Sequence, residues 1–405
     1  MHCGDVSARA IAPAGASRGS AEAVDRRDGG TRLGGMGVTE AVAAVNEEVR
    51  AVLLGVDVMD QGRADQLLDE LDPSPTRERL GGNVTTAASL AVLHAAAALR
   101  GVPVWMQLGG GAPTALPRPE VQIIGGGAHA ARTVDVQDFM IVPMSARTVD
   151  EALVQAAEVY LGVGTALQSR GRVNGVADEG GHWPEVDSHE EALALLVEGI
   201  ERAGLIPGAD VAISLDLAAS ELAEGEGYRL ASEGLWLSRA EWLSRLEQWC
   251  TEFPIVALED PFGEFDLEGL RAATELFGDS RLVIGDDAVV SSAERISEAA
   301  AADRCNAALI KVNQAGTVTA AAEAVRTARA AGWSVIVSAR SGETEDVSVA
   351  HLAVGWGADL IKVGSITRGE RTAKWNELLR IAETLDVPLR PMPAGGQTST
   401  RTNRG

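Results

Sequence analysis

From about residue 116 onward, short runs of β-branched and leucine residues alternate with longer amphipathic stretches. The short runs are almost continuously apolar, which is typical of parallel strands buried on both faces, and the longer stretches have the helical period. The pattern predicts a parallel sheet covered by helices. The strand count favours a closed (β/α)₈ barrel, although an open doubly wound sheet is also compatible with it. The expected strands are 121–125, 210–215, 254–258, 281–285, 307–310, 334–338 and 359–361, and the expected helices are 190–203, 239–252, 267–277, 292–301, 317–331, 345–355 and 372–385.

The first 115 residues have a different character. Residues 1–35 are rich in Gly, Ala, Ser, Arg and Asp, and the segment PAGASRGS at 13–20 is typical of a mobile loop. Helical patterns follow at 38–54 and 84–99, and a three-glycine turn follows at 109–111. We therefore expect a mainly helical N-terminal unit over 1–115, a barrel over 116–390 and a flexible tail over 391–405.

Composition excludes several classes of protein. Asp and Glu number 58 against 35 Lys and Arg, a net charge of −23, and nonspecific nucleic-acid binding needs clustered positive charge instead. Cys3, Cys250 and Cys305 are far apart and form no CxxC motif, which indicates reduced thiols in a cytoplasmic protein. The longest apolar run, at 87–99, is expected to be too short to span a bilayer, and no signal peptide is evident.

Six consecutive expected strands each end in an ionisable side chain. At a single strand end such a residue is usually only the first solvated position of a loop, but three acids followed by three bases is a difficult pattern to reach by that route. In a (β/α)₈ barrel the C-terminal strand ends converge on one mouth, where active sites lie. The six side chains are those of Asp216, Glu259, Asp286, Lys311, Arg340 and Lys362.

These residue types suit one kind of chemistry. Three carboxylates from separate strands form a hard-oxygen site for Mg²⁺, which can neutralise charge as a proton is removed beside a carboxylate. A lysine among other cations is expected to shift toward its neutral form and to act as a base. The remaining lysine and arginine can bind anionic groups. The predicted reaction is proton abstraction next to a carboxylate, through an enediolate.

The same residues lie in segments that resemble the enolase family over nearly the whole chain. The most specific stretch runs from Leu309 to Ile381. The resemblance implies interconversion of 2-phosphoglycerate and phosphoenolpyruvate, a small N-terminal α+β domain, and an eight-stranded barrel that departs from strict alternation at its start. It also implies a cytoplasmic homodimer or higher oligomer. The matching segments are PAGAS, DQLLDELD, VADEGG, SLDLAASEL, LEDPF, IGDD, LIKVNQAGTVTAA, ARSGETED, IKVG and ERTAKWNELLRI.

The resemblance also implies roles for individual residues. Lys311 is similar to the family's general base, and Glu179 of DEGG to the acid that assists departure of the hydroxyl. Ser17 of PAGAS is similar to the serine that reaches a second magnesium. The ligands implied for the first magnesium are Asp216, Glu259 and Asp286, and the implied substrate-binding residues are His129, Asp138, Arg340, Ser341 and Lys362.

Three features depart from the family pattern. Ala339 replaces the histidine of the usual Ser-His-Arg-Ser-Gly-Glu-Thr-Glu-Asp stretch, and Asp138 replaces the usual glutamate of Gln-Glu-Phe-Met-Ile. Asp138 is one methylene shorter, and a misplacement of that size can cost on the order of 10²-fold in rate. Few residues precede PAGAS, so the small domain is expected to lack its first strands, unless the start codon is misassigned.

The departures leave three hypotheses. The chain is an ordinary enolase that tolerates the changes, or a diverged enolase-type enzyme acting on a different phosphoryl or phosphonate carboxylic acid. Carboxyphosphonoenolpyruvate synthases of phosphinothricin-type antibiotic pathways are the example of the second. The third hypothesis is a non-catalytic protein with the enolase fold, against which the retained carboxylates and lysines count. His182, which follows DEGG, is a candidate to replace the missing imidazole.

Overall fold

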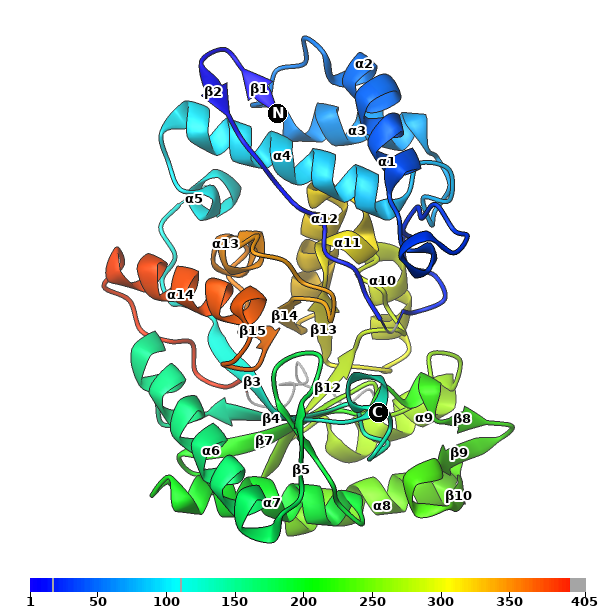
Figure 1. Cartoon of the computed structure of the whole chain (residues 1–405), viewed down its shortest axis with the longest axis vertical. Coiled ribbons are helices and arrows are strands. Elements are labelled where there is room, and N and C mark those ends of the chain that lie inside the picture. The colour runs from blue at the N-terminus through cyan, green and yellow to red at the C-terminus, as the bar shows by residue number, and fades with distance from the viewer. Residues whose placement is uncertain (17, 110, 394–405) are drawn as a thin grey trace, which may run out of the picture.

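The computed structural model describes residues 1–16, 18–109 and 111–393. A mainly helical N-terminal unit lies over a barrel that is surrounded by helices (Figure 1). Ser17 and residues 394–405, which include most of the expected flexible tail, lie outside the described residues.

The N-terminal unit combines a short antiparallel strand pair with helices, as the α+β prediction required. Strands β1 (His2–Cys3) and β2 (Val6–Ser7) pair with each other. The expected helix at 38–54 is formed by three consecutive helical segments, and a further helix, α5, follows the second expected helix and ends at the first glycine of the expected turn. The helical elements are α1 (Thr39–Ala44), the π-helix η2 (Val45–Val49), α2 (Arg50–Leu53), α3 (Gln61–Leu71), α4 (Gly82–Arg100) and α5 (Val104–Gly109).

Helix α4 joins the two parts of the molecule. Among the described residues it is the one helix that is long and apolar enough, by length and composition alone, to cross a membrane, so the expectation that this run is too short is wrong. However, 67% of its most apolar window is buried, as in a core helix. Its polar groups contact the barrel: Ser89 Oγ accepts a hydrogen bond from Val318 N at 2.9 Å, and Thr86 Oγ1 donates to Gly316 O at 3.2 Å.

Eight strands close into a barrel, because the last strand pairs with the first. The second strand is antiparallel to both of its neighbours, and the remaining pairs around the barrel are parallel. The antiparallel strand was not among the expected strands, since no helix separates it from the first. The departure from strict alternation at the start of the barrel is the one that the resemblance implies. The strands are β3 (Arg118–Gly125), β4 (Asp138–Pro143), β7 (Val211–Asp216), β11 (Ile255–Glu259), β12 (Leu282–Gly285), β13 (Ala307–Ile310), β14 (Ser334–Ser338) and β15 (Leu360–Gly364).

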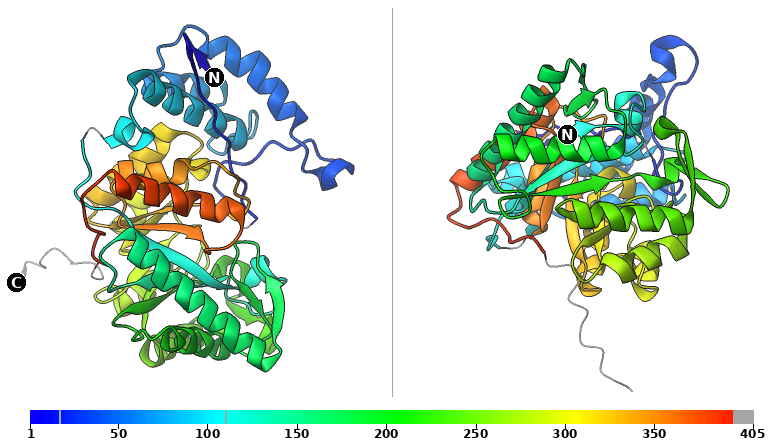
Figure 2. Two further views of the ribbon diagram at one scale, coloured as in Figure 1. Left: turned by 60° about the vertical axis from the view of Figure 1, so that its left-hand side comes forward. Right: turned by 90° about the horizontal axis from the view of Figure 1, so that it is seen from below.

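Helices surround the strands (Figure 2). Most of them begin at a Ser, Thr or Asp whose side chain accepts a hydrogen bond from a backbone N–H of the first turn, which satisfies a donor that the helix itself leaves unpaired. The long helix α6 was missed by the sequence analysis. The helices are α6 (Val149–Arg170), α7 (His189–Arg202), α8 (Arg239–Glu252), α9 (Leu267–Phe277), α10 (Ala293–Ala301), α11 (Val312–Ala315), α12 (Val318–Ala330), α13 (Ser348–Gly355) and α14 (Gly369–Glu383).

A hairpin and a small separate sheet interrupt this pattern. The hairpin of β5 (Val173–Val176) and β6 (His182–Pro184) extends the barrel sheet beside β3, and its turn carries Glu179. A three-stranded antiparallel sheet lies between β7 and α8. Its strands are β8 (Ala223–Glu224), β9 (Gly227–Leu230) and β10 (Leu235–Ser238).

The two-residue period of the strands explains where the charged side chains point. A compact apolar cluster fills the inside of the barrel. Its members on β11, β13 and β15 lie an even number of residues before Glu259, Lys311 and Lys362, so each charged residue continues the inward-facing row of its strand. The apolar cluster is formed by Val142, Ala257, Leu282, Ile284, Ala307, Leu309, Ile336 and Leu360.

Candidate active site

The barrel mouth brings the predicted strand-end residues together. Glu259 pairs with Asp216 across β11 and β7, and Lys362 pairs with Ser338 across β15 and β14. Because β4 is antiparallel, its first residue, Asp138, lies directly opposite Asp216 at the same end of the barrel. One strand start is thereby added to the ring of strand ends.

Lys362 lies among carboxylates. Its Nζ is 2.8 Å from Asp216 Oδ2, 2.7 Å from Glu259 Oε2 and 3.9 Å from Asp138 Oδ2, and all four side chains are buried. Burial alone would lower the pKa of Lys362, but Asp216 and Glu259 raise it well above its ordinary value. Burial and the negative charge of Asp216 raise the pKa of Glu259. Three buried carboxylates therefore surround one buried ammonium group.

Lys311 forms an ion pair with Asp286, whose other oxygen accepts a hydrogen bond from Gln314 Nε2 at 2.8 Å. Burial would lower the pKa of Lys311, but Asp286 raises it above its ordinary value. The expectation that neighbouring cations shift this lysine toward neutrality is therefore wrong for the protein alone. Arg340 and Lys362 do act in that direction, but the adjacent carboxylate outweighs them.

Asp260 was not singled out by the sequence analysis. Its two carboxylate oxygens accept hydrogen bonds at 2.8 Å from the backbone N–H groups of Asp286 and Asp287. Its backbone has a φ of 41°, a conformation that L-residues rarely adopt. Burial, followed by the charge of Asp287, raises the pKa of Asp260. The two adjacent acids of the LEDPF segment could have pointed to this residue. The second of them, Asp260, fixes the loop that carries Asp286.

The residues present fit a divalent cation that prefers oxygen ligands. Within the described residues, Glu259 Oε1 and Asp138 Oδ2 are buried without a hydrogen-bond partner. Asp216 and Asp286 both contribute to the raised pKa of Glu259, so the three predicted carboxylates are electrostatic neighbours. In this structure the predicted carboxylates pair with the lysines. The carboxylates whose ligand atoms lie within 4.8 Å of one another are those of Asp260, Asp286 and Asp287. Buried, unsatisfied carboxylate oxygens are suitable ligands for Mg²⁺.

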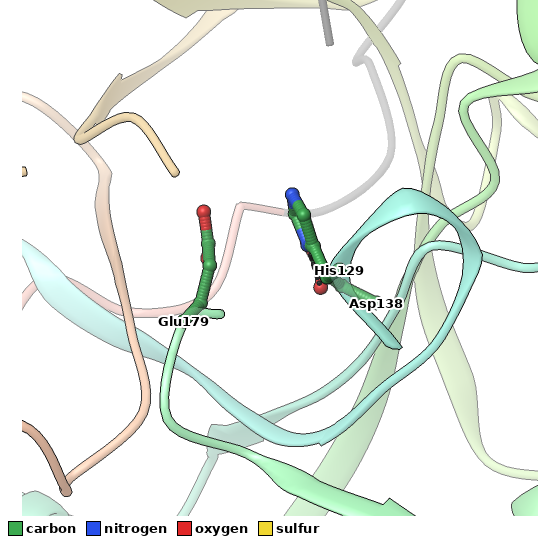
Figure 3. Close-up of side chains that lie close together, drawn as sticks. All are labelled: His129, Asp138 and Glu179. Carbon is green, nitrogen blue, oxygen red and sulfur yellow. Dashed lines mark hydrogen bonds and ion pairs between the residues drawn. The ribbon is translucent and has the colours of Figure 1, made fainter. Parts of the chain in front are cut away.

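A second cluster consists of His129, Asp138 and Glu179 (Figure 3). His129 lies in the short helix η3 (Gly127–Ala130) after β3, Asp138 begins β4, and Glu179 lies in the β5–β6 turn. His129 Nδ1 is 2.9 Å from Asp138 Oδ1, and Gln122 Nε2 donates to the same oxygen. Glu179 is 4.0 Å from the guanidinium of Arg371. The predicted substrate residues His129 and Asp138 therefore lie beside the predicted acid.

The His129–Asp138 pair should make stability depend on pH. Burial would lower the pKa of His129, but Asp138 raises it from 6.5 to about 9. The stabilisation is therefore complete below pH 6.5 and is lost as the pH rises toward 9. In chelator-treated protein we expect the free energy of unfolding to fall by about 3 kcal/mol across this range, as measured by urea denaturation. His129→Gln should remove this slope, and an unchanged slope in the variant would contradict the assignment.

Arg340 and Ser341 lie where the N-terminal segment crosses the mouth. Arg340 Nη1 donates to Asn313 Oδ1 at 3.1 Å, and Ser341 Oγ accepts a hydrogen bond from Ala16 N at 2.7 Å. Ala14 forms an antiparallel bridge with Gly342. The predicted metal ligand Ser17 lies in this segment but outside the described residues.

Ala339, which stands where the resemblance implies a histidine, is buried, and its N–H donates to Lys362 O at 2.8 Å. His182, the candidate to replace the missing imidazole, packs against α6. Its Nε2 is 2.9 Å from Tyr160 O, its ring stacks on Tyr160 with centroids 4.0 Å apart, and it approaches Gly164 on α6. These contacts hold the ring against α6, so we expect His182 to have no part in the reaction.

His182→Ala should therefore affect stability and not catalysis. Losing a stacked, hydrogen-bonded and buried ring is expected to cost about 2 kcal/mol in the free energy of unfolding, and turnover should remain within twofold of the unmodified chain. Thermal unfolding and steady-state kinetics on the same preparation measure the two effects. A tenfold loss of turnover in folded protein would restore His182 as a candidate.

Comparison with known proteins gives consistent matches. The family described as "Enolase, C-terminal TIM barrel domain" matches residues 113–390, and "Enolase, N-terminal domain" matches residues 2–108. "Enolase 1" of Desulfitobacterium hafniense is 44% identical over 385 residues, which cover 94% of this chain and 88% of that protein. "Enolase" of Aeropyrum pernix is 46% identical over 378 residues, covering 93% and 87%.

Proposed function

Because the chain belongs to the enolase family, we propose that it is a Mg²⁺-dependent lyase that converts 2-phosphoglycerate into phosphoenolpyruvate and water, and back. The observation that carries the proposal is the group of Asp216, Glu259, Asp286, Lys311 and Lys362 at one barrel mouth, in which all but Lys311 are buried and the Lys311 side chain is 12% exposed. The group combines a base, a cation that can bind the substrate carboxylate, and carboxylate oxygens that can bind Mg²⁺.

The first half-reaction removes a proton from carbon. Asp216, Glu259 and Asp286 would hold Mg²⁺, which supplies positive charge where negative charge develops on the substrate carboxylate. A metal ion held by Asp286 would offset the charge that keeps Lys311 protonated, while Arg340 and Lys362 lower the pKa of this lysine. Neutral Lys311 then takes the C2 proton onto Nζ. Lys362 binds the substrate carboxylate and exchanges one of its present carboxylate partners for it. Ser17 is proposed as a ligand of a second Mg²⁺.

The second half-reaction expels the C3 hydroxyl. Glu179 donates the proton that converts the hydroxyl into water, and His129 and Asp138 position the substrate beside it. Arg340 and Ser341 bind the phosphoryl group, because a guanidinium and a hydroxyl suit phosphate oxygens. The substrate class is therefore a small phosphorylated carboxylic acid.

Two substitutions among the residues proposed for the second half-reaction are compatible with one alternative, a diverged enolase-type enzyme. The methyl group of Ala339 replaces an imidazole, and Asp138 is engaged by His129 and Gln122. An enzyme that keeps proton abstraction but acts on a different phosphoryl or phosphonate acid, as carboxyphosphonoenolpyruvate synthases do, would tolerate these changes. A non-catalytic role would leave the buried lysine–carboxylate group without a use.

One assay separates these functions. Purified chain with Mg²⁺ and 2-phosphoglycerate is expected to raise the ultraviolet absorbance as phosphoenolpyruvate forms, and chelation by EDTA should abolish the increase. Exchange of the C2 proton with solvent in the absence of dehydration would favour the diverged enzyme. Neither reaction in Mg²⁺-bound protein would favour the non-catalytic role.

We also propose a cytoplasmic homodimer or higher oligomer with domains at 1–115 and 116–390, followed by a tail at 391–405. The two family matches, at 2–108 and 113–390, support a division near this place. Light scattering coupled to size-exclusion chromatography tests the oligomeric state, and a particle of 42.2 kDa would contradict it.

A further inference from the structure

A carboxylate of the N-terminal unit reaches the phosphate end of the proposed site. Both carboxylate oxygens of Glu22 accept hydrogen bonds from Arg340 Nη2, at 3.0 and 3.2 Å. Glu22 is 2% exposed and Arg340 is 3% exposed. An ion pair withdrawn from water to this degree costs desolvation energy, and removal of either member leaves the buried charge of the other less well compensated.

The remainder of Arg340 is also held. Its Nη1 donates to Asn313 Oδ1 at 3.1 Å, and its backbone N–H donates to Glu343 Oε1 at 3.1 Å. Its carbonyl oxygen accepts a hydrogen bond from Arg371 Nη1 at 2.6 Å. The backbone and one guanidinium nitrogen are therefore fixed by the barrel, whereas Nη2 is held by Glu22 from the other unit.

Glu22 is itself fixed in place. Next to it, Ala23 N donates to Gln314 O at 3.1 Å, and Val24 O accepts a hydrogen bond from Gly82 N at 2.6 Å at the start of α4. Gln314 also donates to Asp286. The segment that carries Glu22 is thus attached both to α4 and to the loop beside the proposed metal ligands.

We propose that Glu22 is a positioning residue that holds the Arg340 guanidinium in the orientation in which it binds the phosphoryl group of the substrate. A guanidinium offers a planar set of donors, so a carboxylate on one side determines which N–H groups face a ligand on the other. The inference rests on the proposed function for the role of Arg340. It adds that the N-terminal unit contributes a charged group to the site.

Glu22→Gln tests the proposal, since it preserves shape and removes charge. We expect the KM for 2-phosphoglycerate to rise about tenfold with kcat changed less than threefold, and the binding of inorganic phosphate to weaken about tenfold. Glu22→Asp keeps the charge, so its KM and its phosphate affinity should lie between those of Glu22→Gln and those of the unmodified chain. Ser20→Ala is the matched control: it removes the Ser20 Oγ–Glu264 contact from the same segment and leaves Arg340 untouched. Its values should stay within twofold of the unmodified chain.

Phosphate binding is measured by phosphorus NMR line broadening, so the test does not depend on turnover. If the unmodified chain binds phosphate but does not convert 2-phosphoglycerate, the proposed function fails, and weaker phosphate binding in Glu22→Gln still supports the positioning role. Glu22→Gln should cause no further loss when added to Arg340→Gln. Unchanged or tighter phosphate binding in Glu22→Gln, or full additivity with Arg340→Gln, would overturn the proposal. If Glu22→Gln fails to fold, the same criteria apply to Glu22→Asp.

Discussion

Lys311→Ala is expected to lower kcat for 2-phosphoglycerate dehydration by about 10⁴-fold, the upper range for loss of a general base. The residue ends the inward-facing row of β13 and lies against Asp286. No other lysine is placed to replace it, because the chain has only two more, Lys362 and Lys374. Lys362 is held by Asp216 and Glu259, and Lys374 by Glu343 at 3.0 Å.

Lys311→Arg is the informative companion variant. It retains a positive charge beside Asp286, so it controls for loss of the ion pair, but a guanidinium does not deprotonate in proteins. Both variants should therefore be inactive in the absorbance assay while remaining folded by circular dichroism. More than a tenth of the original kcat in either variant would show that another group removes the proton.

The second large effect is expected for Glu259→Gln. The side chain is completely buried, and one of its oxygens lacks a hydrogen-bond partner within the part of the chain that is described. Replacing the charged ligand by an amide of the same shape should weaken Mg²⁺ binding about 100-fold, an effect of about 3 kcal/mol. It should also lower turnover at subsaturating Mg²⁺. Calorimetric Mg²⁺ titration measures the first effect, and activity against Mg²⁺ concentration measures the second.

Glu268→Gln is the matched control for Glu259→Gln. Its side chain is 82% exposed and pairs with Arg239 on the surface. The same chemical change there should leave the Mg²⁺ dependence unaltered. Identical Mg²⁺ affinity in Glu259→Gln and the unmodified chain would remove Glu259 from the proposed ligands.

The strand-end residues were predictable because two simple regularities coincide. Side chains alternate along a strand, and the parallel strands of a barrel end at the same mouth, so Glu259, Lys311 and Lys362 could be placed together from their spacing alone. The scarcity of lysine was a further signal. Of 35 basic residues only three are lysines: Lys362 and Lys374 are buried, and the side chain of Lys311 is only 12% exposed. Arginine provides the other positive charges, but it cannot serve as a base.

The features that were missed depend on long-range contacts. The direction of β4 cannot be read from DFMIVP, yet it decides that Asp138 joins the mouth at its first residue rather than its last. Glu22 lies 318 positions before its partner Arg340, and no local pattern marks it. His182 lies three residues after Glu179, but β6 turns its ring toward Tyr160. Local sequence placed the strands, whereas tertiary packing determined these partners.

The most direct test of the central claim is exchange of the C2 proton of 2-phosphoglycerate in D₂O, followed by proton NMR. The residues proposed to hold Mg²⁺ at the strand ends and to act as the base are all present in this chain, whereas Ala339 and Asp138 replace the histidine and glutamate that the resemblance implies. Proton abstraction should therefore occur whatever the rate of dehydration. We predict loss of the C2 signal in the presence of Mg²⁺, and retention of the signal with EDTA or with Lys311→Ala. A C2 signal that persists in the folded, Mg²⁺-loaded chain, with no phosphoenolpyruvate formed, would contradict the account.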